Sequence, residues 1–249
     1  MQGLQRFSAL LRKHTNWEQR QNGGHQHEVI PDSCKIVRLG VGFGMHEACD
    51  IPHEMHNKCV FYSVGIQNDY SFDKDLVDRY GCKGFALDPS IVHPSILTPN
   101  VIFMSIGASL LTRHQHGADD WQVTSMPSLR RFLQHDYVDV LKMDCEGCEY
   151  SLARDILLED PAFFSHVGQV ILEIHVFLDI AKTHEHAANL GRLFILLERS
   201  GLVLIDARIA GCSREDEAKG CGPDILESGY ICEANAMCHN LLFGRLNGS

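Results

Sequence analysis

Apolar runs alternate with amphipathic stretches from about residue 59 onward, a pattern typical of βαβ construction. The stretch that begins at about Ser71 predicts a helix, which ends at Gly81, where a C-terminal cap belongs. Phe72, Leu76 and Tyr80 share one face of this helix. Short apolar, β-prone runs predict strands at Cys59–Val64, Lys83–Leu87, Val101–Ser105, Val138–Met143, Val170–Ile174, Leu202–Ala207 and Leu241–Leu246.

Three more helices are predicted: one with Pro127 in its first turn, one over Glu149–Leu158 and one over about His184–Arg199. Together these elements predict an α/β fold with a doubly wound, Rossmann-like sheet of seven strands. The sheet is expected to be mostly parallel, with one antiparallel strand contributed by the final hairpin. We expect a flexible N-terminal segment at residues 1–30 and a single domain at residues 31–249, of which residues 31–58 form an N-terminal cap.

Polar side chains follow four of the five predicted parallel strands. Asp88, Ser105 and Asp144 come directly after or at the end of a strand, and Glu173 and His175 close the fifth. Ligands of open α/β sheets bind at this carboxyl edge, near the point where the strand order reverses. Because side chains alternate along a strand, Glu173 and His175 are expected to point the same way, which makes His175 a candidate general base.

The first strand ends at Gly65, where a glycine permits close approach of the backbone to a ligand. Asp88 follows 23 residues later and could accept hydrogen bonds from the ribose hydroxyls of an adenosyl nucleoside. The alternative is that Asp88 only starts a turn. A glycine run at Gly40–Gly44 looks more like a dinucleotide loop, but neither a helical pattern nor an acid at the right distance follows it. We interpret it as a loop in the cap.

Three carboxylates lie close together after the fourth parallel strand. Asp144 and Glu146 suit ligand positioning or general-base work, whereas Glu149 suits the N-terminus of the following helix. The histidines outside the strand ends, including His114, His116, His184 and His186, are expected to lie on loops. Asp144 and Glu146 could instead hold a divalent cation, but this alternative ranks below a role in ligand positioning or as a general base, and no metal site is assigned.

The charge and the apolar content of the chain limit the classes of partner that it could bind. The formal net charge of -10 and the scattered basic residues disfavour nucleic acid, and no apolar run is long enough for a membrane span, so the chain is expected to be soluble. Its 10 cysteines are interpreted equally well as disulfides or as buried thiols, with a metal site third. The compartment therefore stays open between the cytoplasm and an oxidising lumenal or secreted location.

Several of these motifs, taken in order from about Cys34 to His175, resemble the FkbM-type methyltransferases, and Cys238–Phe243 fits the end of their pattern. Val64, Cys145 and Cys148 depart from the residues common in that family. The resemblance implies a class I methyltransferase fold with S-adenosylmethionine as cofactor. The residues that carry it are Tyr62–Ile66, Ser71–Asp73, Tyr80–Cys82, Leu87–Ser90, Leu141–Glu149 and Glu173–His175.

Residue by residue, the candidate contacts of S-adenosylmethionine are Gly65, Ile66, Asp88, Ser105 and Asp144, and the candidate catalytic residues are His175, Asp144 and Glu146. The expected reaction is methylation of a hydroxyl oxygen on a small molecule or glycan. An NAD-dependent oxidoreductase is the alternative enzyme, although Gly65 lacks the G-x-G-x-x-G pattern. A methyltransferase fold that has lost catalysis and serves as a binding module is the non-enzymatic alternative.

Overall fold

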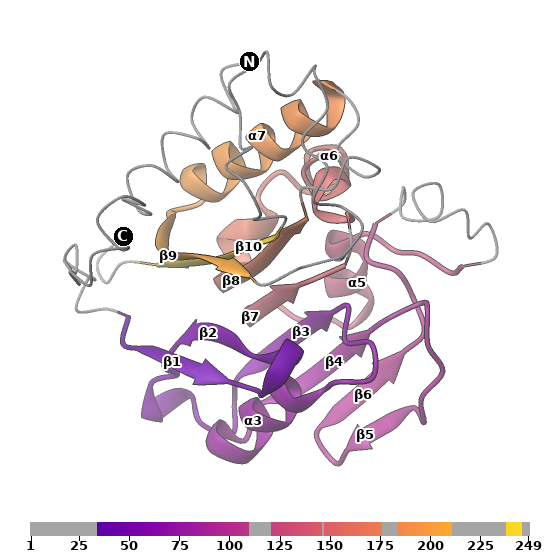
Figure 1. Ribbon diagram of the computed structural model, residues 1–249, viewed down its shortest axis with the longest axis vertical. Coiled ribbons are helices and arrows are strands. Elements are labelled where there is room, and N and C mark those ends of the chain that lie inside the picture. The colour runs from indigo at the N-terminus through magenta and orange to yellow at the C-terminus, as the bar shows by residue number, and fades with distance from the viewer. Residues whose placement is uncertain (1–33, 110–120, 146, 176–183, 211–237, 246–249) are drawn as a thin grey trace.

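The computed structural model describes residues 34–109, 121–145, 147–175, 184–210 and 238–245, which form an α/β domain around one large sheet (Figure 1). The strand order in this sheet is β5-β6-β4-β3-β7-β8-β10-β9. The helices are α3 (Ser71–Tyr80), α5 (Met126–Phe132), α6 (Glu149–Glu159) and α7 (His184–Arg199). The strands of the sheet are β3 (Val60–Val64), β4 (Lys83–Leu87), β5 (Ile96–Thr98), β6 (Val101–Met104), β7 (Val138–Met143), β8 (Val167–His175), β9 (Leu202–Ala210) and β10 (Cys238–Arg245).

Five neighbouring strands, from β6 to β8, pair in parallel, and β10 pairs antiparallel with both β8 and β9. The predicted doubly wound sheet with an antiparallel final strand is therefore confirmed. The strand order reverses between β3 and β7, which places a topological switch point at their carboxyl ends.

The prediction of seven strands was wrong by one. Strand β5 adds to the edge of the sheet and pairs antiparallel with β6, so the sheet has eight strands, two of them antiparallel. This strand spans three residues and its side chains are exposed or only half-buried. A segment so short and so exposed has no alternation of apolar and polar residues by which the sequence could reveal it.

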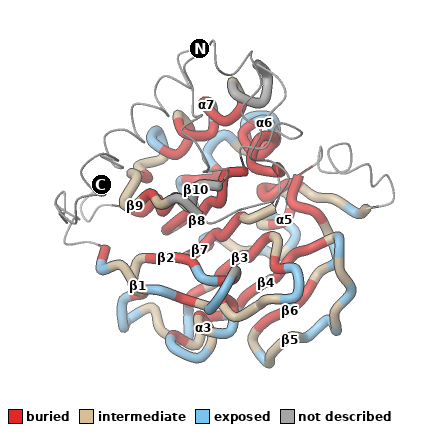
Figure 2. The backbone as a smooth tube through the Cα atoms, viewed as in Figure 1, coloured by how far each residue is buried: buried red, intermediate tan, exposed pale blue. Residues whose placement is uncertain are grey.

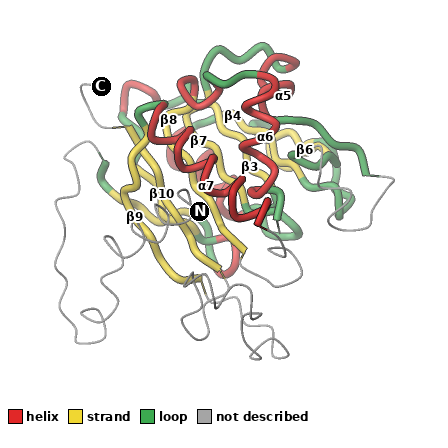
Figure 3. Tube along the Cα trace, turned by 90° about the horizontal axis from the view of Figure 1, so that it is seen from above, coloured by secondary structure: helices red, strands yellow, loops and turns green. Residues whose placement is uncertain are grey.

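Side chains alternate between two hydrophobic clusters, one on each face of the sheet. Tyr62, Leu141 and Leu172 pack with α5, α6 and α7, whereas their neighbours in sequence Phe61, Val140 and Ile171 pack with α3 and the cap. The central strands β3, β7 and β8 are consequently buried along most of their length, as the tube coloured by burial makes visible (Figure 2). The view from above places α5, α6 and α7 over the same face of the sheet (Figure 3).

Residues 34–58, called the cap here, contain a two-stranded antiparallel sheet of β1 (Ile36–Leu39) and β2 (His46–Cys49). The Cys34–Cys49 disulfide closes the open end of this hairpin. The side-chain amide of Gln169 on β8 accepts a hydrogen bond from the Cys49 N–H at 2.8 Å and donates one to the Cys49 carbonyl at 3.0 Å. The cap is thus fastened to the middle of the large sheet.

Disulfides account for six of the cysteines. Two further disulfides, Cys59–Cys82 and Cys145–Cys148, are present, and no free cysteine occurs among the described residues. Within the described ranges no helix is long and apolar enough to cross a membrane. The expected flexible segment at residues 1–30, Glu146, His114, His116 and the Cys- and Gly-rich insertion lie outside the described residues. The expectation that His184 and His186 lie on loops was wrong, because both belong to the first turn of helix α7.

Candidate active site

The predicted site residues meet at the carboxyl edge of the central strands. Asp144 directly follows β7, and Glu173 and His175 end the neighbouring strand β8. The Nε2 atom of His175 lies 3.6 Å from Oδ1 of Asp144 and 3.7 Å from Oε1 of Glu173. The prediction that Glu173 and His175 point the same way is confirmed, and the structure adds that Asp144 converges on the same ring nitrogen.

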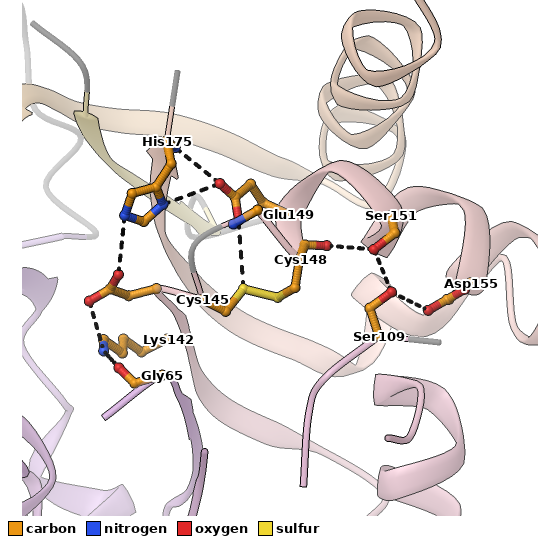
Figure 4. Close-up of a disulfide and its surroundings, with 11 residues drawn as sticks. Gly65, Ser109, Lys142, Cys145, Cys148, Glu149, Ser151, Asp155 and His175 are labelled. Atoms are coloured by element: carbon orange, nitrogen blue, oxygen red, sulfur yellow. Dashed lines mark hydrogen bonds and ion pairs between the residues drawn. A yellow bond between two sulfur atoms is a disulfide. The ribbon is translucent and has the colours of Figure 1, made fainter. Parts of the chain in front are cut away.

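Glu149 holds the other side of the His175 ring. This glutamate is fully buried, and its Oε1 atom accepts the His175 backbone N–H at 3.0 Å and lies 3.2 Å from Nδ1 (Figure 4). A carboxylate at Nδ1 places the ring proton there and leaves the lone pair of Nε2 toward Asp144 and Glu173. Glu149 does begin helix α6, as the sequence indicated, but its contact with His175 was missed because the two residues lie far apart in the chain.

Lys142 neutralises part of this acidic edge. Its buried ammonium donates to the Gly65 carbonyl at 2.8 Å and lies 3.4 Å from Oδ2 of Asp144 (Figure 4). Alternation along β7 places Lys142 and Asp144 on the sheet face that carries the cap. The lysine thereby ties the end of β3 to the end of β7.

Packing within the protein gives Gly65 a reason to be a glycine, while the predicted approach of a ligand to its backbone stays a prediction. Its φ of +73° is left-handed, and a Cβ atom would lie 1.5 Å from the Asp144 carbonyl oxygen. Its N–H donates to the Leu87 carbonyl at 2.8 Å, and its carbonyl accepts from Lys142. The close approach here is between two strand ends, with both backbone groups of Gly65 already paired within the protein. The next residue, Ile66, is buried.

Asp88 stands at the tip of β4 and takes part in the turn that the alternative interpretation proposed. Its Oδ2 atom accepts the Gln67 N–H at 2.8 Å, while Oδ1 accepts the N–H of Ser90 at 2.9 Å and its hydroxyl at 2.6 Å. A carboxylate has about four acceptor positions, so one position on Oδ2 remains. Ser105 lies on the next strand end, where its exposed side chain donates to the Ile91 carbonyl at 3.4 Å.

The Gly40–Gly44 run forms a loop in the cap, as predicted. A 3-10 turn, η1 (Gly42–Gly44), leads from this loop into β2, so no helix follows the glycines. The loop docks on the start of α3, where Gly40 N–H donates to Asp75 Oδ2 at 2.9 Å and Gly44 N–H donates to Asp69 Oδ2 at 3.1 Å. These contacts bring the following residue pair, Met45 and His46, to the edge of the sheet.

His46 is a site residue that the sequence reasoning missed. Its side chain is 1% exposed, neither ring nitrogen has a hydrogen-bond partner among the described residues, and Nε2 lies 4.0 Å from Asp144 Oδ2. Burial, followed by the Lys142 ammonium, lowers the pKa of His46 to about 4, so the imidazole is neutral at neutral pH. The short cap strands have no periodic signal that would have singled out this histidine.

Comparison with known proteins shows to which family the chain belongs. A family model described as a methyltransferase domain matches residues 8–208. The chain is 29% identical over 133 residues to probable methyltransferase-like protein 24 of Homo sapiens, a match that covers 51% of this chain and 36% of that protein. The rat protein of the same name, from Rattus norvegicus, is 27% identical over 132 residues, with 51% and 36% covered. The match therefore spans little more than a third of the length of these curated relatives.

Solved structures of similar arrangement include a SAM-dependent methyltransferase from Archaeoglobus fulgidus, with 9% identity, a TM-score of 0.37, and 77% of this chain and 89% of that chain covered. Another is the fibrillarin pre-rRNA processing protein of Methanococcus jannaschii, with 12% identity, a TM-score of 0.38, and 90% and 86% covered. Because the family model matches well over half of its residues, the chain belongs to the methyltransferase domain family.

Proposed function

We propose that this chain transfers a methyl group from S-adenosylmethionine to a hydroxyl oxygen of a small molecule or glycan. The observation that carries the proposal is the His175 ring, which Glu149 holds by Nδ1 while Nε2 faces Asp144 and Glu173 at the carboxyl edge of the sheet. Membership in the methyltransferase domain family and the resemblance to the FkbM-type branch support it.

The chemistry of the strand ends suits this cofactor. Bound S-adenosylmethionine supplies a methyl group activated by a positively charged sulfur. The carboxylate of Asp144 is 22% exposed and would favour such a cation, although Lys142 offsets part of its charge. Asp88, with one free acceptor position, would bind a ribose hydroxyl, and Ile66 would contact the cofactor beside it. Ser105, at the end of the neighbouring strand β6, would be a further contact of the cofactor at the same edge of the sheet.

His175 is the proposed general base. Its Nε2 lone pair would remove the proton of the acceptor hydroxyl as the oxygen attacks the methyl carbon, while the C–S bond breaks with its electron pair on sulfur and releases S-adenosylhomocysteine. Asp144 and Glu173 would then stabilise the imidazolium, because each places a carboxylate oxygen within 3.7 Å of Nε2. Alignment of donor and acceptor supplies the rest of the rate enhancement. Glu146, the third carboxylate of the predicted catalytic set, lies outside the described residues and keeps its proposed place in the site.

The acidic balance of the chain supports a small or neutral acceptor. A formal net charge of -10 opposes binding through phosphates, and the basic pair Arg130 and Arg131 is engaged by the carboxylates of Asp160 and Glu159. An NAD-dependent oxidoreductase remains the alternative enzyme, and a binding module without catalysis is the other alternative.

Thermal shift of the purified chain separates these functions. We expect S-adenosylhomocysteine to raise the melting temperature and NAD to leave it unchanged, because a ligand that binds only the native state stabilises it. Asp88→Ala should weaken this binding by roughly 1–3 kcal/mol. Asp78→Ala, which removes an exposed carboxylate from α3, serves as the control. A shift with NAD alone would favour the oxidoreductase, and no shift with either ligand would contradict the proposed cofactor.

Catalysis requires a second experiment with an acceptor found by screening hydroxylated small molecules and glycans. We expect His175→Ala to lower turnover by about 10²–10⁴ while affinity for S-adenosylhomocysteine is retained. His53→Ala, which removes an exposed cap histidine, is the matched control. Full activity of the His175 variant would assign the base to a carboxylate instead.

The compartment we propose is an oxidising one. Three disulfides join six of the cysteines, and such bonds are rare where glutathione keeps thiols reduced. Mass spectrometry of the protein isolated from its native source, alkylated before any reduction, tests this placement. Free thiols at these six positions would contradict it.

A further inference from the structure

We infer that His46, Asp144 and Glu173 form a binding site for a divalent first-row transition-metal ion, next to the proposed base His175. One imidazole nitrogen and two carboxylate oxygens of these residues lie within 4.8 Å of one another. The inference adds a metal to the site of the proposed function. Binding of the ion by these three side chains can nevertheless be measured whether or not methyl transfer is the reaction.

The spacing of the three side chains fits one shared ion. Ligand atoms at about 2.0–2.2 Å from a metal lie roughly 3–4 Å from each other. His46 Nε2 and Asp144 Oδ2 are 4.0 Å apart, and the limit of 4.8 Å for the whole group leaves only small side-chain rotations to close the site. The residues come from three separate elements: β2 in the cap, the end of β7 and β8.

His46 is the observation that separates this cluster from an ordinary group of acids. Its ring is buried to 99%, and neither nitrogen has a hydrogen-bond partner in the described part of the chain. Burying a polar group without a partner costs free energy, so native proteins rarely leave one unsatisfied. An edge-to-face contact with the Phe72 ring, at 5.7 Å between centroids, directs the imidazole. A metal at Nε2 would satisfy the buried nitrogen that faces Asp144.

The cap holds His46 in place from both sides. Gly44, two residues before it, donates to Asp69 beside the start of α3. Cys49, three residues after it, is bonded to Cys34 and forms both of its backbone hydrogen bonds with Gln169 of β8. These anchors fix β2 over the same strand that carries Glu173. Supports of this kind orient the ligands of metal sites.

The local charge favours a cation. Asp144 and Glu173 contribute two carboxylates, and buried Glu149 lies on the far side of the His175 ring. Among the described residues, Lys142 is the one ammonium that forms an ion pair with Asp144. One imidazole and two carboxylates form a mixed nitrogen and oxygen donor set, which suits Mn²⁺ or Zn²⁺ better than Ca²⁺. The neighbouring group of Cys145, Cys148 and Glu149 is excluded, because its two sulfurs are joined in a disulfide and are not thiolates.

Three protein ligands leave coordination positions open for an acceptor hydroxyl. A hydroxyl bound there becomes more acidic, as metal-bound oxygens do. Its O–H bond breaks with the electron pair kept on oxygen, and the proton passes to Nε2 of His175. The oxygen would then carry the negative charge, which the ion would stabilise until the oxygen attacks the methyl carbon. The C–S bond of the donor would break with its electron pair on sulfur, and neutral S-adenosylhomocysteine would leave.

Isothermal titration of the full chain, stripped with a chelator and dialysed, provides the test. We expect Zn²⁺ and Mn²⁺ to bind with a stoichiometry of one specific site and Ca²⁺ to bind weakly. His46→Ala, Asp144→Asn and Glu173→Gln should each reduce the affinity for Mn²⁺ at least about tenfold. His53→Ala and Glu54→Gln, two exposed cap residues of matching types, should leave it unchanged, which separates the site from adventitious binding by the other histidines. Circular dichroism verifies that each variant folds, and the two isosteric variants keep the test valid if His46→Ala does not fold.

Absence of saturable Mn²⁺ and Zn²⁺ binding, or affinity unaffected in the two isosteric variants, would overturn the inference. Thermal shift with S-adenosylhomocysteine on the same metal-free protein distinguishes this failure from failure of the proposed function. Cofactor binding without any metal site would leave the proposed function in place and remove only the metal. A metal site without cofactor binding would leave the metal inference in place and contradict only the proposed function.

Discussion

Glu149 and His175 contact each other twice: one carboxylate oxygen, Oε1, accepts the backbone N–H at 3.0 Å and lies 3.2 Å from Nδ1 of the ring. The other oxygen accepts the Gly147 N–H at 2.9 Å. A single buried side chain thereby sets the end of β8, the first turn of α6 and the tautomer of the imidazole. The position of the proposed base depends on this carboxylate.

Glu149→Gln tests that dependence. The amide keeps the size of the side chain, but its NH₂ group must face either the Gly147 N–H or the two His175 donors. We expect turnover to fall by roughly 10–100-fold, because the Nδ1 proton is no longer held by a carboxylate. Nitrogen NMR shifts of the His175 ring should show a mixture of tautomers. An unchanged rate and a single tautomer would contradict the role, and Glu54→Gln is the exposed control.

Gly65→Ala tests the contact between the ends of β3 and β7. The new Cβ would collide with the Asp144 carbonyl, and an alanine would also be strained at the left-handed φ of this position. We therefore expect a loss of several kcal/mol in the free energy of unfolding. Gly42→Ala is the matched control, since its φ is +57° and nothing lies within 4 Å of its Cβ position. That variant should lose only about 1–2 kcal/mol. Chemical denaturation measures both, and equal losses would show that the Asp144 contact is unimportant.

Asp73→Asn tests a buried carboxyl in the first turn of α3. Burial raises the pKa of Asp73 to about 7, while its unfolded value is near 3.8. Between these values the native state binds a proton that the unfolded state has lost, so the stability from this group is present at low pH and lost as the pH rises toward 7. The asparagine keeps an acceptor for the Ser63 hydroxyl and cannot ionise.

We therefore expect the stability advantage of Asp73→Asn over the wild type to grow from about pH 5 to about pH 8, by up to roughly 3 kcal/mol. Urea denaturation at several pH values measures this difference. Other titrating groups such as His46 are present in both proteins, so their contributions to the stability cancel in the difference. Asp78→Asn, an exposed position on the same helix, should give a flat difference. A flat difference for Asp73→Asn would mean that the native carboxyl is ionised throughout.

Replacing both Cys34 and Cys49 by serine tests the anchoring of the cap. The disulfide joins residues 15 positions apart, and closing a loop of that length stabilises a protein by about 3 kcal/mol. We expect a lower melting temperature and faster hydrogen exchange in β1 and β2 than in the central strands. Addition of dithiothreitol to the variant should then have a smaller effect than on the wild type. Identical melting of both proteins would show that Gln169 alone secures the cap.

The amino-acid sequence by itself determined the central architecture. Runs such as Val138–Met143 and the spacing of Phe72, Leu76 and Tyr80 carry periods that are local, so the helices and every strand of the large sheet except β5 could be predicted within a few residues. The same alternation placed Glu173 and His175 on one face. Motifs at the strand ends indicated a methyltransferase without any knowledge of the packing, and the match to a methyltransferase domain confirms that broader assignment.

Only the tertiary structure decided how the site is assembled. His46 and Asp144 are almost 100 positions apart, and Glu149 reaches His175 across 26 positions, so no local period links either pair. Strand β5 and the cap strands contain three or four residues each, too few for alternation to be read. The glycine at position 65 is required by a carbonyl from another strand. Periodicity describes which face of an element is buried, whereas the partners on that face are set by how the elements pack.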